Sequence, residues 1–173
     1  MVSEQDARNN ERETQMSNQD DLEPVMPHDQ VAEFIVAFSG SLDPRLWVKL
    51  IDEELAELLA EKYGTTEHLK ELCDLLYVST GLALTVPEHI GLLMRPKERD
   101  KTAKQQGQVS RMLDSGLEHY GEKVFIEAFR RVHESNMSKL DKSGNPILRD
   151  DGKVMKGPDY KEPDLTDLLE KAA

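Results

Sequence analysis

Residues 50–74 read LIDEELAELLAEKYGTTEHLKELCD, and this stretch decides the fold. Two segments of helical periodicity flank the short connection KYGTT, and each segment carries two carboxylates three residues apart. The first pair is Glu54 with Glu57, and the second is Glu71 with Asp74. A connection this short predicts two adjacent, antiparallel helices. On such a hairpin the four carboxylates converge on one site.

The positions of these acids on their helices distinguish them from an ordinary solvated face. At about 100° per residue, Glu54 falls inside the apolar arc of the first helix, and Asp74 interrupts the apolar run LCDLLYV. A buried carboxylate is costly unless it is paired or bound to a metal. The helical wheel places Lys49 and Lys70 away from these faces, which leaves few basic partners. The sequence therefore predicts a site for Mg²⁺, with Mn²⁺ as a substitute, because hard cations take oxygen ligands.

The rest of the chain divides into a tail and one helical domain. Residues 1–27 are polar and lack aliphatic periodicity, which predicts a flexible tail. Helical periodicity follows in four stretches, 29–39, 44–63, 66–85 and 124–137, and in a short last helix capped by Asp164. The expected N-caps of the first three are Asp29, Asp43, and Thr65 or Thr66, and Gly40 is the expected end of the first. Residues 72–78 are apolar nearly all round apart from Asp74, which predicts a helix in the middle of a bundle or at an oligomer interface. The expected fold is all-α, with four to six helices in residues 28–173. We expect residues 86–121 to be less regular, and the Gly- and Lys-rich segment after residue 138 to form at most a short hairpin.

Composition excludes several classes of protein. The formal net charge of −12 is a poor match for nucleic acid, because phosphate contacts need Lys and Arg. The sequence contains no run of about 18 apolar residues, so it predicts no membrane span, and the first residues lack a secretory pattern. The single cysteine, Cys73, excludes an internal disulfide and is expected to be a small buried hydrophobe. We therefore expect a protein of a reducing compartment, the cytoplasm, or the host's cytoplasm for a viral chain.

Two separated motifs resemble a known superfamily. Glu54-x-x-Glu57, then Glu71-x-x-Asp74 followed by LLYV, resembles the signature of the all-α nucleoside triphosphate pyrophosphohydrolases, which include MazG-type enzymes, dimeric dUTPases and phosphoribosyl-ATP pyrophosphohydrolases. Residues 132–165, VHESNMSKLDKSGNPILRDDGKVMKGPDYKEPDL, are similar to the end of MazG-like members. The resemblance implies a MazG-like helical bundle that assembles as a homodimer or homotetramer, with two or more Mg²⁺ ions per site.

The resemblance also implies roles for individual residues. The metal ligands would be Glu54, Glu57, Glu71 and Asp74. Glu53 would be a further ligand or would orient the attacking water, so the candidate catalytic residues are Glu53 and Glu54. The residues that match phosphate-binding positions are Asn136, Lys139, Lys153, Lys156 and Tyr160. The candidates for stacking on the base are Phe34, Phe38 and Trp47, each of which also fits an ordinary core position.

The activity implied is cleavage of a (d)NTP to the monophosphate and pyrophosphate. We favour a purine nucleotide such as dGTP or GTP, although no residue selects the base. The alternatives are a dUTP or dCTP pyrophosphatase, a phosphoribosyl-ATP pyrophosphohydrolase, and a metal-stabilised helical scaffold without catalysis. Residues 86–121 depart from the family as an insertion that would be a lid, a dimer contact or a tether. Its basic residues are expected mainly to form a solvated face: Arg95, Lys97, Arg99, Lys101 and Lys104.

Overall fold

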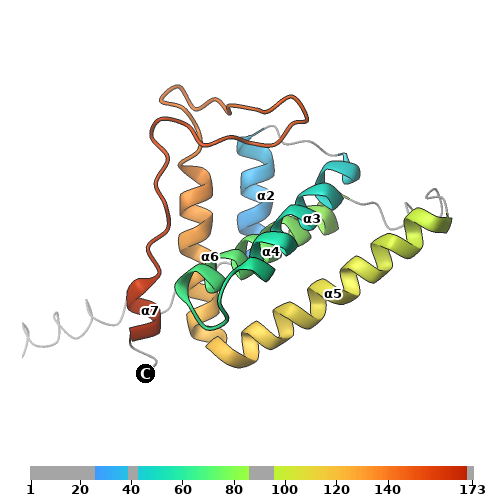
Figure 1. Cartoon of the computed structure of the whole chain (residues 1–173). Helices are drawn as coiled ribbons and strands as arrows, with labels where there is room; N and C mark the ends of the chain where they lie inside the picture. The colour runs from blue at the N-terminus through green and yellow to red at the C-terminus, as the bar shows by residue number, and fades with distance from the viewer. Residues whose placement is uncertain (1–25, 39–42, 86–95, 171–173) are drawn as a thin grey trace, which may run out of the picture.

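The computed structural model describes residues 26–38, 43–85 and 96–170, and in these ranges the chain is helical without a strand. Its helices are α2 (Pro27–Ala37), α3 (Pro44–Ala60), α4 (Thr66–Thr85), α5 (Pro96–Tyr120), α6 (Glu122–Met137) and α7 (Thr166–Glu170) (Figure 1). The all-α prediction is confirmed, while nearly all of the predicted tail lies outside the described residues. None of the described helices has the length and apolar character needed to cross a bilayer.

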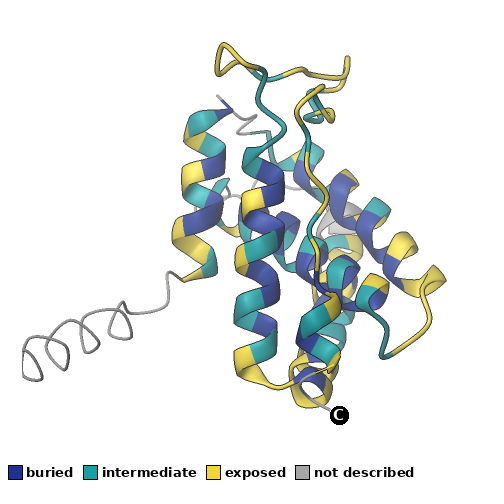
Figure 2. Cartoon of the chain, turned by 90° about the vertical axis from the view of Figure 1, so that its left-hand side faces the viewer, coloured by how far each residue is buried: buried dark blue, intermediate teal, exposed yellow. Residues whose placement is uncertain are grey.

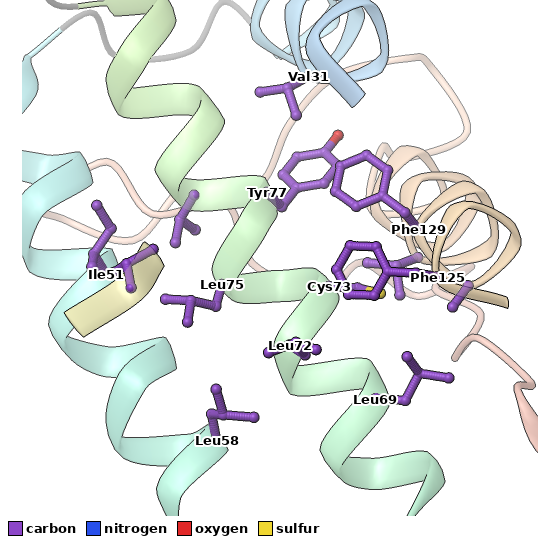
Figure 3. Close-up of a cluster of buried hydrophobic side chains, with 14 of the residues drawn as sticks. Val31, Ile51, Leu58, Leu69, Leu72, Cys73, Leu75, Tyr77, Phe125 and Phe129 are labelled. Atoms are coloured by element: carbon purple, nitrogen blue, oxygen red, sulfur yellow. The ribbon is translucent and has the colours of Figure 1, made fainter. Parts of the chain in front are cut away.

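Helix α4 is the centre of the bundle. It contacts α2, α3, α5 and α6, and its leucines project into the core on several sides (Figure 3). Leu69, Leu72 and Leu75 are fully buried. Figure 2 shows buried positions along the inward faces of the surrounding helices, with exposed positions outside. A helix that is apolar nearly all round needs neighbours on every side, and this is the place that α4 takes.

Side-chain caps begin the helices where the sequence predicts them. The Asp43 carboxylate accepts a hydrogen bond from the backbone N–H of Arg45 at 2.9 Å, and Pro44 follows at the first helical position. Thr65 Oγ1 accepts from the backbone N–H of His68 at 3.2 Å at the start of α4. Such caps satisfy N–H groups that have no partner inside the helix. They fix where each of the two helices of the acidic hairpin begins.

Helix α2 differs from its predicted start. Asp29 was expected to cap it, but the helix begins at Pro27 with Met26 as the capping residue, and Asp29 lies in the first turn. A proline at the first helical position loses no hydrogen bond there, so the helix extends back to it. The predicted stop at Gly40 lies outside the described residues.

Helix α5 corrects the prediction of an irregular segment at residues 86–121. Residues 96–120 form one continuous helix that packs against α3, α4 and α6. Few apolar side chains attach it, among them the buried Val109 and Tyr120. Gly116 adds a close contact, since a Cβ there would lie 1.9 Å from Cδ2 of Leu72. A contact made by the absence of a side chain leaves no apolar stripe, and the sequence pattern therefore missed the helix.

The basic residues of this segment agree with a solvated face as far as they are described. Lys101 Nζ donates to Asp52 Oδ2 at 3.0 Å, and both side chains are exposed. Lys104 is also exposed. Arg95 and the side chains of Lys97 and Arg99 lie outside the described part. An exposed pair such as Lys101 with Asp52 contributes little to stability.

The segment between α6 and α7 runs back across one end of the bundle before it descends to α7 (Figure 1). An isolated antiparallel bridge joins Leu148 to Val154, which confirms the predicted short hairpin. Arg149 N donates to Lys153 O at 2.8 Å within it. This hairpin brings Gly152 and Lys153 to the pocket beside α3.

Candidate metal centre and its pocket

Three carboxylates of the two acidic motifs meet between α3 and α4. Glu54 comes from α3, and Glu71 and Asp74 come from α4. Each offers an oxygen atom that lies within 4.8 Å of the others. Glu54 and Glu71 are each 9% exposed. The predicted convergence is confirmed for these three residues, because the short connection places α3 and α4 side by side.

Glu57 does not join this group. It is exposed on α3, one turn after Glu54, although its charge still helps to raise the pKa of Glu54 and of Glu71. The structure therefore brings together three of the four carboxylates that the motif pattern and the resemblance assign to a metal. Glu57 stands at the solvent side of the cluster.

Glu53 points to the C-terminal hairpin instead. Its Oε2 accepts a hydrogen bond from Lys153 Nζ at 2.6 Å, and its Oε1 accepts from Arg149 Nη2 at 3.3 Å. The hydrogen bond from Lys153 is the main reason that the pKa of Glu53 is lowered. Lys49 strengthens the same junction, with Nζ 3.8 Å from Glu53 Oε1 and a bond to Asp151. These ion pairs hold the hairpin against α3.

The cluster is electrostatically strained among the described residues. Burial raises the pKa of Glu54 to about 8, and the charges of Asp74, Glu57 and Glu71 add to that rise. Glu54 makes no hydrogen bond or ion pair with any described residue. Burial also raises the pKa of Glu71, whose Oε2 is buried without a hydrogen-bond partner. Buried carboxylate oxygens without a partner are expensive, and a cation bound between them would remove that cost.

Lys70 lies in the cluster, where the helical wheel did not place it. Its Nζ donates to Glu71 Oε1 at 2.7 Å and to Asp74 Oδ2 at 2.8 Å. Asp74 is one turn further along α4, and the flexible stem of a lysine also reaches the adjacent Glu71. Burial alone would lower the pKa of Lys70, but the two carboxylates raise it above its usual value. The prediction that the acids lack a basic partner is wrong for Glu71 and Asp74.

A pocket that is open to solvent lies beside the carboxylates, and Glu54 and Asp74 are among the residues that line it. Its lining also contains Asn136 from α6, together with Lys139 and Lys153 from the segment that follows. The other lining residues are mostly apolar or aromatic. The pocket thus sets oxygen ligands for a cation beside side chains that can bind an anion.

Three of the five predicted phosphate-binding residues reach the pocket. Lys139 Nζ donates to Asn136 Oδ1 at 2.6 Å, and burial lowers the pKa of Lys139, while Asp74 and Glu54 act in the opposite direction. Lys153 also lines the pocket and forms an ion pair with Glu53. Asn136 lies in α6, and the two lysines lie in the segment that follows it, so the folded chain brings all three residues to the acidic motifs.

Lys156 and Tyr160 do not line the pocket. Lys156 is exposed, with Nζ 3.3 Å from Glu162 Oε1 and 4.4 Å from the centre of the Tyr160 ring. Both residues belong to the stretch after the hairpin, and their contacts are with each other and with Glu162. The structure thus separates them from Asn136, Lys139 and Lys153.

The aromatic residues divide in the same way. Phe34 and Trp47 line the pocket, whereas Phe38 is fully buried and stacks on Phe34 with ring centres 4.1 Å apart. Sequence reasoning missed Tyr77, which also lines the pocket and whose hydroxyl lies 3.0 Å from His133 Nδ1. A signal was present, because Tyr77 follows Asp74 by three residues and shares its helix face.

The raised pKa of Glu54 predicts a pH-dependent stability in the absence of metal. The folded state holds the Glu54 proton up to about pH 8, whereas the unfolded chain releases it near pH 4.5, so ionisation costs stability as the pH rises between these values. His68 and His133 act oppositely, because burial lowers the pKa of each. A comparison with Glu54→Gln cancels the histidine contributions.

Urea unfolding in EDTA at pH 5 and pH 7.5 measures this difference. Relative to Glu54→Gln, the unfolding free energy of the wild type should fall by up to about 3 kcal/mol over that interval. Saturating Mg²⁺ should remove most of the fall, because a cation favours the ionised carboxylate. Parallel pH profiles of the two proteins in EDTA would show that Glu54 is ionised in the folded state at both pH values.

The described residues thus form a buried cluster of three carboxylates that can hold a divalent cation, with Lys70 on its edge. A pocket whose lining includes basic and aromatic residues adjoins it. No protein-family model, curated protein or solved structure matches the chain.

Proposed function

We propose that the protein is a Mg²⁺-dependent nucleoside triphosphate pyrophosphohydrolase, which cleaves a (d)NTP to the (d)NMP and pyrophosphate. One observation carries the proposal: Glu54 and Asp74 line the same pocket as Lys139 and Lys153. A metal-bound polyphosphate needs both, because cations neutralise part of its charge and basic side chains the remainder.

The donor set fits Mg²⁺. All the atoms that converge are carboxylate oxygens, and Mg²⁺ is commonly held by a few carboxylates together with substrate phosphates. Glu71 Oε2 is a buried acceptor without a partner, as expected of a ligand position. Glu54, Glu71 and Asp74 would hold the ion, and Mn²⁺ would substitute for it. The bound ion would supply charge stabilisation at the phosphoryl group and acidify a water molecule.

The chain's own residues would do the positioning. Lys139, Asn136 and Lys153 would bind phosphate oxygens and offset the charge of the leaving pyrophosphate. The water oxygen bonds to the α-phosphorus, and the bond from that phosphorus to the α–β bridging oxygen breaks, with its electron pair leaving on pyrophosphate. A carboxylate takes the water's proton. Glu53 becomes available for this role once the polyphosphate draws Lys153 away from it.

The base and the assembly belong to the same proposal. The pocket lining includes Trp47, Phe34 and Tyr77, which would contact the nucleoside, and a purine such as that of dGTP or GTP is the proposed preference. dUTP, dCTP and phosphoribosyl-ATP are the alternatives. We propose a homodimer or homotetramer in the cytoplasm, with no nucleic acid as partner.

One observation favours a second candidate, a helical scaffold without catalysis. Lys70 already satisfies one oxygen each of Glu71 and Asp74, so part of the cluster is neutralised without any metal. In that case the acids stabilise the α3–α4 hairpin and the pocket has no turnover.

Product analysis separates the two candidates. The full chain is incubated with Mg²⁺ and each (d)NTP, and separately with Mg²⁺ and phosphoribosyl-ATP. The products are resolved by anion-exchange chromatography. We expect equal amounts of monophosphate and pyrophosphate from at least one nucleotide. Release of single phosphate would reject the proposed bond cleavage. Nucleotide binding without any product would favour the scaffold.

A further inference from the structure

We infer that the site takes one divalent cation per chain, and that the Lys70 ammonium group occupies the place of a second. This inference rests on the metal site of the proposed function and departs from the two or more ions that the family resemblance implies. It follows from which oxygen atoms Lys70 uses and which it leaves.

The oxygens divide into two sets. Lys70 Nζ takes Glu71 Oε1 and Asp74 Oδ2, at 2.7 and 2.8 Å. The second oxygen of Glu71 is buried and without a partner. The carboxylate of Glu54, buried and equally unpartnered in the described structure, lines the adjoining pocket. At least one oxygen of each of the three acids therefore stays available, which suits one ion that completes its shell with water and phosphate oxygens.

Charge leads to the same number. The three carboxylates carry three negative charges when ionised, and Lys70 balances one of them. One divalent cation balances the other two. A second ion would add two positive charges to a site that already has Lys139 within its electrostatic reach. Close like charges repel strongly at a site shielded from water.

The geometry leaves little for a second ion to use. Paired catalytic metals lie about 3.5–4 Å apart, and a carboxylate that binds one ion with each oxygen needs both oxygens free. Lys70 holds one oxygen each of Glu71 and Asp74. The other nearby acids are Glu57, which is exposed and outside the cluster, and Glu53, which is held by Lys153. Two ions would therefore require Lys70 to leave.

Counting bound Mn²⁺ tests the inference without any measure of activity. The full-length chain is titrated with Mn²⁺ in about 0.15 M KCl, which screens exposed acids, and free Mn²⁺ is followed by its paramagnetic resonance signal. For each protein, the number of site-bound ions is the number of bound Mn²⁺ ions that is lost when Glu54→Gln is added. We expect one per chain in the wild type and two in Lys70→Met. Lys70→Arg keeps the positive charge of the side chain and should still bind one Mn²⁺ ion per chain. Lys101→Met is the matched control, because it removes an exposed lysine and its ion pair with Asp52.

Each outcome has a distinct meaning. Two Glu54-dependent ions in the wild type would overturn the inference and leave the metal site of the proposed function standing. One ion in both the wild type and a folded Lys70→Met would show that Lys70 does not replace a cation, and would also overturn it. No Glu54-dependent ion in the wild type would remove the metal site itself, and with it the proposed function. Circular dichroism and Lys70→Gln, with the same expectation of two ions, guard against a misfolded methionine variant.

Discussion

Glu54→Gln is expected to abolish Mg²⁺-dependent turnover, with kcat lowered about 100-fold or more. The amide keeps the shape of the side chain but loses the charge that a divalent cation needs. Glu54 is the one acid of the cluster that neither Lys70 nor any other described residue pairs, so both of its oxygens are available to a cation. The variant should also lose the rise in Tm that Mg²⁺ gives the wild type, because a ligand stabilises only a state that binds it.

Pyrophosphate release and thermal melts with and without Mg²⁺ measure both effects. Glu118→Gln is the matched control: it removes an exposed glutamate on α5 and should behave as the wild type in both assays. The helical circular dichroism of Glu54→Gln should be unchanged, since relief of like-charge repulsion favours the fold. Near-wild-type kcat in Glu54→Gln would show that the ligand assignment is wrong.

Gly81→Ala is expected to destabilise the fold and to disturb the pocket. A Cβ at Gly81 would lie 2.3 Å from Cζ3 of Trp47 and 2.5 Å from its Cε3. Trp47 is 5% exposed, so its rigid ring is packed on most sides. Such overpacking typically costs about 1–3 kcal/mol and occasionally more. The higher helix propensity of alanine offsets about 1 kcal/mol of this cost. Because the new contacts are so short, we expect the upper end of the range and a net loss of about 2 kcal/mol in unfolding free energy, or a Tm lower by about 4–8 °C.

Trp47 is the chain's single tryptophan, so its fluorescence reports on this contact directly. The emission of Gly81→Ala should shift, and because Trp47 lines the pocket, KM for the nucleotide should rise. The control is Gly107→Ala in α5, where the nearest atom to a new Cβ is Arg111 Nη1 at 3.8 Å. It should stabilise by up to about 1 kcal/mol. Equal stabilisation by both substitutions would mean that the indole ring yields without cost.

Local sequence patterns predict much of this fold. The Asp43 and Thr65 caps, the proline after Asp43 and the apolar periodicity set where α3 and α4 lie, because each acts within one or two helical turns. The short turn between these helices then brings Glu54 to Glu71 and Asp74. Neither long-range pairing nor knowledge of the other helices is needed for that step.

Helix α5 and the C-terminal hairpin show where local patterns end. Gly116 attaches α5 by letting Leu72 approach, and a missing side chain has no hydrophobic signature. The path of the hairpin depends on the ion pair between Lys153 and Glu53, which are far apart in the sequence. That path decides which of several similar lysines reaches the pocket. The spacing of the lysines along the chain does not identify that residue.

By itself, the sequence determined an all-α protein whose two acidic pairs lie on one helical hairpin. The structure then brought Glu54, Glu71 and Asp74 together and left Glu57 exposed. The tertiary structure alone decided what surrounds these acids. It turned Glu53 toward Lys153 and placed Lys70 on two of the three carboxylates. The physical reason is that helical periodicity specifies the direction of a side chain at its Cα, whereas the charged end of a long side chain goes where a partner from the packed structure receives it.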